Sequence, residues 1–196
     1  MPKLTEITTI INTALETNVF NTSRFQGAKY NAVAELVKEK QGDTIISRPC
    51  TVDDDGECTG VSVDDTYPMQ IYHRVVNLSY AEVTNENFGD AVTTLKEIAT
   101  MALVLISDRS RVEKRTDELM AAVAVNLPAT LTNAELATLD LYDCQIRATG
   151  QCVIDAEVVY NREYNLPEYY LKPNSVMCSL NYTIETIYSR KCFGLC

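Results

Sequence analysis

The residues in this sequence that could do chemistry are one histidine, His73, and seven cysteines. A histidine can activate a serine or cysteine nucleophile, and clustered cysteines and histidines can bind zinc. His73, however, has no cysteine or carboxylate beside it, and the cysteines form no Cys-x-x-Cys pair. Phosphate-binding glycine loops, the Gly-x-Ser-x-Gly elbow and the His-Glu-x-x-His motif are also absent. We therefore predict a structural histidine and a protein that is not an enzyme, with no catalytic residues, cofactor or metal ligands.

Two pairs of cysteines share one spacing. Cys50 and Cys58 flank an acidic turn, and Cys144 and Cys152 flank a turn-like segment that ends at Gly150. If each span is a hairpin, each pair would face across neighbouring strands, close enough for a disulfide if oxidised. An odd number of cysteines in a chain without a secretory signal instead favours reduced thiols. The sequence leaves both states open.

Length and composition predict a folded protein and exclude some partners. The chain has 196 residues, 46% hydrophobic and 22% charged, enough for one domain or two small ones with a real core. Its net charge of −10 disfavours a sequence-independent grip on nucleic acid and docking on anionic lipid. No apolar run reaches the ~18 residues of a membrane span, and the first residues lack a secretory-signal pattern. We expect synthesis in a cytoplasm and no membrane partner.

The elements that must position these residues begin with helical spacing. Apolar residues from Leu4 to Val19 recur as on one helix face, with Thr5 as a candidate N-cap. A second helix is predicted over about 25–40, closed by Gly42 as a left-handed C-cap. Residues 1–42 are therefore expected to be an N-terminal helical pair packed on an α+β domain formed by residues 43–196.

The middle of the chain predicts a hairpin, a strand and a long helix. Short β-like runs surround the acidic turn between residues 44 and 65, and residues 68–83 read as one long strand. Apolar residues over 85–109 return to the helical period, which predicts a long amphipathic helix. A shorter helix is expected from Thr116 to Val125, and a capping box at Thr132–Glu135 begins another.

The C-terminal part shows period-two alternation. Apolar and polar residues alternate from Cys152 to about Asn161 and again from Val176 to about Glu185, which predicts two long antiparallel strands. The expected fold class is thus α+β: an antiparallel sheet with long C-terminal strands packed against one long helix, preceded by the helical pair.

Two segments could contact a partner. Residues 165–174 connect the two late strands and are unusually apolar, so they form either a projecting hairpin arm or a loop folded back on its own domain. The stretch 108–115 is strongly basic, so it either is a solvated connection or meets an acidic partner or a phosphate backbone. The candidate interaction residues are Leu166, Tyr169, Tyr170, Leu171, Arg109, Arg111, Lys114 and Arg115.

The order of these elements resembles the tail-terminator and head–tail connector proteins of tailed double-stranded DNA phages. The features that carry the resemblance are the predicted helix over 85–109 between β segments, the long C-terminal strands and the arm at 166–171. The resemblance implies a virion structural protein in a sixfold or twelvefold homo-oligomeric ring, between the portal or neck and the tail tube. It also implies that long strands and the segment 166–171 extend into neighbouring subunits and complete their sheets by strand addition, and that an acidic lumen lets DNA slide through.

Two other classes remain possible from the sequence. One is a soluble, non-enzymatic adaptor module that binds a single protein partner. The other is an enzyme that uses His73 and a cysteine.

Overall fold

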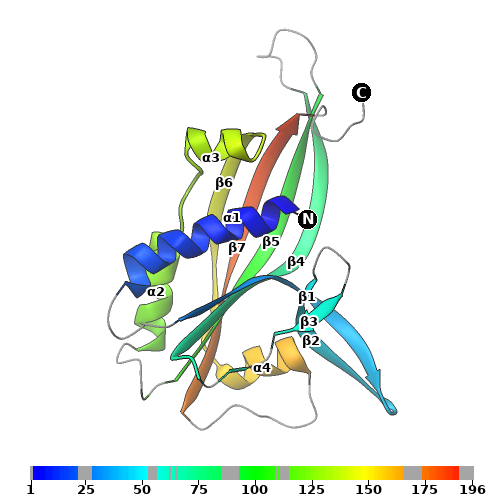
Figure 1. The fold of residues 1–196 in the computed structure, drawn as a ribbon, viewed down its shortest axis with the longest axis vertical. Coiled ribbons are helices and arrows are strands. Elements are labelled where there is room, and N and C mark those ends of the chain that lie inside the picture. The colour runs from blue at the N-terminus through cyan, green and yellow to red at the C-terminus, as the bar shows by residue number, and fades with distance from the viewer. Residues whose placement is uncertain are drawn as a thin grey trace.

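The computed structural model describes residues 2–21, 28–52, 57–61, 63–64, 66–84, 93–108, 110, 115–165 and 174–189. They form a mixed α+β structure around one seven-stranded sheet, in the order β3–β2–β1–β4–β5–β7–β6 (Figure 1). Neighbouring strands are antiparallel, except that β1 runs parallel to β4. The strands are β1 Lys29–Gln41, β2 Thr44–Val52, β3 Cys58–Gly60, β4 Met69–Thr84, β5 Thr93–Asp108, β6 Leu141–Val153 and β7 Ser175–Ser189.

Helices cover both faces of the sheet. The N-terminal helix α1 runs from Pro2 to Leu15 and continues as a π-helical turn, η1, over Glu16–Phe20. It packs on one face together with α2, Thr116–Asn126, and α3, Asn133–Thr138. The opposite face carries α4, Ala156–Tyr164. Among the described helices, none is long and apolar enough to cross a membrane.

The sequence patterns of several elements are confirmed. The apolar period from Leu4 to Val19 is α1 with η1, although Thr5 lies inside the helix rather than at its cap. The predicted helix at Thr116 is α2, and the capping box forms at the start of α3, where Thr132 and Glu135 bond each other's backbone. The long strand predicted over 68–83 is β4, and the second late strand is β7.

The long helix predicted over 85–109 is wrong. Residues 93–108 are the central strand β5, paired with β4 on one side and β7 on the other. Its residues are buried on both faces: Met101, Leu103 and Leu105 lie under α1 and α2, whereas Val104 and Ile106 belong to the core under α4. A strand covered on both faces reads as a continuous apolar run, which periodicity alone cannot distinguish from a buried helix.

The second helix of the N-terminal pair is also wrong, because residues 29–41 form β1. Gly42 does adopt a left-handed conformation, with φ +62°, but in the two-residue turn to β2 rather than at a helix end. A tight hairpin turn and a helix C-cap both require such a residue, so glycine alone did not separate them. The division expected between residues 42 and 43 falls inside this turn, and β1 belongs to the same sheet as β4.

The first of the two late strands is wrong in most of its length. The strand β6 ends at Val153, and Asp155 then caps α4 by accepting hydrogen bonds from the backbone N–H of Glu157 (3.0 Å) and Val158 (3.2 Å). Burial there follows helical spacing instead, with Val159, Tyr160, Glu163 and Tyr164 buried and Ile154 and Val158 exposed. Cys144 and Cys152 consequently lie in one strand, not across a hairpin, and both are free thiols.

Candidate functional site

Most of the candidate interaction residues lie outside the part of the chain that the structure describes: Leu166, Tyr169, Tyr170, Leu171, Arg109, Arg111 and Lys114. The projecting arm expected at 165–174 is therefore not tested. Arg115 is described, and it lies at the N-cap of α2 with an exposed side chain. Its guanidinium forms two bonds to the carboxylate of Asp117, from Nε (3.1 Å) and Nη2 (2.9 Å). Within the described residues, Arg115 is thus tied to its own helix.

His73 is part of β4, and its side chain is wholly buried beneath α1. Its Nε2 is 2.8 Å from Oδ1 of Asn12, and its Nδ1 is 2.7 Å from the hydroxyl of Tyr182. Because a carbonyl oxygen only accepts, Nε2 carries the proton and Nδ1 accepts from the tyrosine hydroxyl. Burial lowers the pKa of His73 to about 3, so the imidazole stays neutral. Each ring nitrogen already has a hydrogen-bond partner, so neither is available to activate a described cysteine. This agrees with a structural role.

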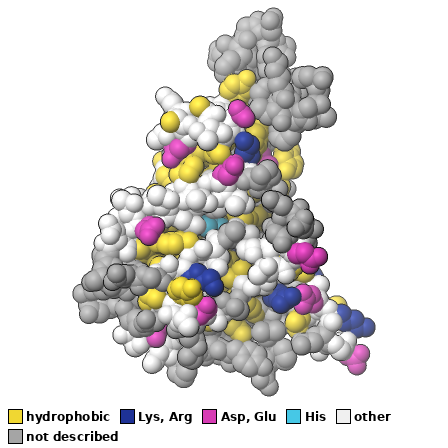
Figure 2. All heavy atoms as spheres, in the orientation of Figure 1, with side chains coloured by type: hydrophobic (Ala, Val, Ile, Leu, Met, Phe, Trp, Pro, Cys, Tyr) yellow, Lys and Arg dark blue, Asp and Glu magenta, His cyan; other side chains and the backbone are white. Residues whose placement is uncertain are grey.

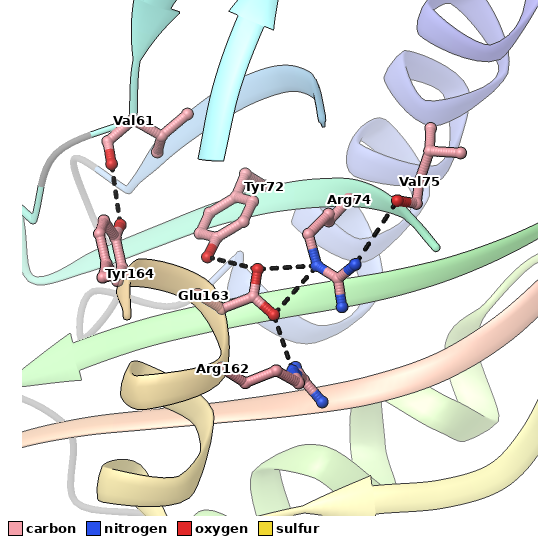
Figure 3. A network of polar contacts seen from close by, with 7 residues as sticks. All are labelled: Val61, Tyr72, Arg74, Val75, Arg162, Glu163 and Tyr164. Carbon is pink, nitrogen blue, oxygen red and sulfur yellow. Dashed lines mark hydrogen bonds and ion pairs between the residues drawn. The ribbon is translucent and has the colours of Figure 1, made fainter. Parts of the chain in front are cut away.

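A second buried polar group, Glu163 on α4, was not singled out from the sequence. Its carboxylate accepts hydrogen bonds from the hydroxyl of Tyr72 (3.3 Å), from Nε of Arg74 (2.8 Å to the nearer oxygen) and from Nε of Arg162 (2.8 Å). Figure 3 shows these three side chains meeting at the carboxylate from β4 and α4. Burial, with Glu163 as the next cause, raises the pKa of Tyr72 well above its ordinary value. The cluster joins α4 to the sheet, and the Glu163 carboxylate at its centre is closed to solvent.

The titratable groups of the described residues do not form a metal centre. No group of three or more His, Cys, Asp or Glu side chains among them is arranged to hold an ion. Figure 2 shows acidic and basic side chains scattered over the face that carries α1, without a single charged patch. The buried polar residues His73 and Glu163 lie where helices contact the sheet.

The clearest outward feature is a two-stranded arm, defined here as residues 35–50 of β1 and β2. Beyond Ala34, β1 no longer pairs with β4, and seven pairs from Glu35↔Cys50 to Gln41↔Thr44 continue as a hairpin that projects from the body (Figure 1, lower right). No described strand pairs with the other edge of β1 along residues 35–41. Within the described residues, this edge of the arm therefore carries backbone donors and acceptors without a strand partner.

A disulfide between Cys50 and Cys58 closes the base of the arm, with the two Cα atoms 5.6 Å apart. It joins β2 to the short strand β3, whose three residues pair with Cys50–Val52. The pairing across neighbouring strands predicted for these cysteines is confirmed, and the alternative of two free thiols is not the state found. The arm thus leaves the body from a covalently fixed point.

A second outward feature lies where β6 passes into α4. Ile154 and Val158 are 51% and 53% exposed, and they flank the capping residue Asp155. We call these two residues the α4 entry patch. Its position on the molecule is opposite the arm, because β6 forms the other end of the sheet.

No family model and no curated protein matches the chain. The case for its function therefore rests on the geometry above.

Sequence reasoning missed the arm and the α4 entry patch for the same reason. The helix predicted over about 25–40 covers the first strand of the arm, and the strand predicted from Cys152 to about Asn161 includes Ile154. The turn at Gly42–Asp43 and the cap at Asp155 were the local signals that could have located both features.

Proposed function

We propose that this protein is a non-enzymatic structural subunit that assembles with copies of itself into a ring. The single observation that carries the proposal is the arm, residues 35–50. An isolated two-stranded hairpin is marginally stable in water. Free strand edges, in turn, template pairing with another chain. A hairpin that projects with an unpaired edge is therefore suited to contact a neighbouring subunit.

The finer form of the proposal is a tail-terminator or head–tail connector ring in the neck or tail of a tailed double-stranded DNA phage. Fewer features support this form than the sequence suggested. The segment 93–108, part of the predicted helix over 85–109, is strand β5, and the segment 166–171 lies outside the described residues. Of the features that carry the resemblance, the structure contains the long strand β7. The disulfide adds support, because disulfides persist on virion surfaces.

Light scattering and negative-stain imaging of the purified chain test the ring. We expect a mass that is a multiple of the single chain and closed particles with a central opening. A strict monomer at high concentration would contradict assembly and favour an adaptor that binds one protein partner.

A separate observation tests the phage assignment, namely the identity of the neighbouring genes. Capsid, portal and tail genes beside this one are expected. Neighbours unrelated to virion assembly would remove the phage form of the proposal and leave the ring untouched.

A further inference from the structure

We propose that, in the assembly, the arm of one copy packs on the α4 entry patch of the next, head to tail. This inference rests on the proposed self-assembly and names the two surfaces that make the contact. Three features of the described residues carry it: an exposed apolar side chain on the arm, an exposed apolar pair at the patch, and charges of opposite sign beside them.

The arm presents an apolar side chain next to two cations. Ile45 follows the turn and is 61% exposed. It pairs with Lys40 across the hairpin, and Lys38, two residues away, lies on the same face of the ribbon because strand side chains alternate. The side chains of Lys38 and Lys40 are both exposed. A partner for this face needs an apolar surface bordered by carboxylates.

The α4 entry patch has this character. Ile154 directly precedes the capping residue Asp155, and Val158 lies in the first turn of α4, where its backbone N–H donates to Asp155 (3.2 Å). Glu157 lies in the same first turn of the helix, and Asp155 and Glu157 are exposed. The patch is therefore apolar with two carboxylates at its border, which complements Ile45, Lys38 and Lys40.

The acceptor is the patch rather than the backbone edge of β6. Pairing of β6 with β7 is interrupted between Ala148 and Cys152, and Gly150 there has φ +78°. A bulge of this kind bends an edge strand and blunts simple extension of the sheet. Side-chain packing on Ile154 and Val158 does not need a regular edge.

The partner is a second copy because one chain carries both surfaces and its arm projects away from its own patch. Figure 1 shows the arm at lower right and β6, which leads into α4, on the left. The helix α4 reaches from the end of β6 to the base of β2, and the arm projects away from it beyond that base, so the tip of the arm is directed away from the patch of its own chain. A contact between two different surfaces leaves one free arm and one free patch on every pair, so addition continues, and it ends in a ring where the rotation between neighbouring copies closes.

Charge-introducing substitutions test the contact. Ile45→Asp and Ile154→Asp each place a carboxylate in the apolar centre, and each is expected to weaken self-association about tenfold or more. The matched control is Val125→Asp, which changes the most exposed large apolar residue on α2, at 83% exposure, away from both surfaces. Sedimentation velocity gives the association constants, and thermal melting checks that all three variants fold.

Cross-linking identifies the acceptor without relying on a disruptive variant. A photoreactive benzoylphenylalanine at position 45, in a mixture of heavy- and light-isotope chains, should join residue 45 of one copy to the peptide around Ile154 and Val158 of another. Cross-links from residue 45 to a different surface of a second copy, with assembly intact, would overturn the inference and leave the proposed ring standing. A wild-type chain that stays monomeric would overturn both.

Discussion

Two buried polar residues hold helices to opposite faces of the sheet. His73 bonds Asn12 on α1 and Tyr182 on β7, and Glu163 on α4 bonds Tyr72 and Arg74 on β4. A buried polar group without partners costs free energy, so each contact strongly favours one position of its helix. Both residues therefore help to hold a helix on the sheet.

His73 should make the protein sensitive to mild acid. Its pKa is about 3 when folded and near 6.5 in an unfolded chain. Protons therefore bind the unfolded state first, and stability that is complete above about pH 6.5 is lost as the pH falls toward the folded value. Between pH 7 and pH 5 this single group should lower the free energy of unfolding by about 2 kcal/mol.

Urea unfolding at the two pH values measures this loss. The control is His73→Gln, which cannot titrate and should remove most of the difference between pH 7 and pH 5, whatever its effect at pH 7. An equal pH dependence in both proteins would show that another group is responsible.

Removal of the charge on Glu163 should lower the free energy of unfolding substantially. Glu163→Gln leaves Arg74 buried without its ionic partner, and breaking a buried pair from one side costs about 3–5 kcal/mol. Asp117→Asn is the matched control, because it removes an equivalent carboxylate from the exposed pair with Arg115 and should cost less than about 1 kcal/mol. Equal costs in urea unfolding would mean that the Glu163 cluster contributes no more than a surface pair.

Among the elements, β3 depends most on a covalent tie. It has three residues and one neighbouring strand, so backbone pairing alone holds it weakly. The disulfide closes a short loop, with Cys50 and Cys58 eight positions apart. Loss of such a crosslink frees the unfolded chain and the end of the sheet together.

Cys50→Ser with Cys58→Ser should therefore lower the free energy of unfolding by about 2–3 kcal/mol. Cys152→Ser, at an exposed free thiol, is the control and should change it little. A double variant as stable as the control would show that the disulfide adds nothing to the fold. Mass spectrometry of unreduced peptides checks first that the purified protein contains the bond.

Local signals in the sequence located the elements that are set by nearby backbone groups. The capping box at Thr132–Glu135 and the start of α2 depend on contacts within one helical turn. The strands β4 and β7 were recognised by their extended, alternating patterns. By contrast, β1 pairs with β2 and with the more distant β4, and β5 pairs with β4 and with the distant β7. The predicted helices there failed because pairing in the sheet outweighed helical spacing.

At the scale of the whole molecule, the proposed contact joins the arm of one copy to the α4 entry patch of another. Mixing two variants, each defective in one of these surfaces, tests this polarity. Ile45→Asp removes a working arm but keeps the patch, and Ile154→Asp does the reverse. Each variant alone should stay largely monomeric, whereas an equal mixture retains one intact contact per pair and should stop at dimers. Mass photometry distinguishes the outcomes. Larger particles in the mixture, or no association at all, would contradict a single contact of this polarity.

The sequence by itself determined a mixed α+β protein with a substantial core, a single histidine suited to a structural role, and the caps and turns that need particular residues. Only the tertiary structure decided that 93–108 is a central strand, that β1 and β2 project as an arm, and that Ile154 is exposed. The physical reason is the sequence distance between the groups that stabilise each feature. Caps and turns are satisfied by residues a few positions away, whereas strand pairing, burial on two faces and surface exposure depend on groups that folding brings from elsewhere in the chain.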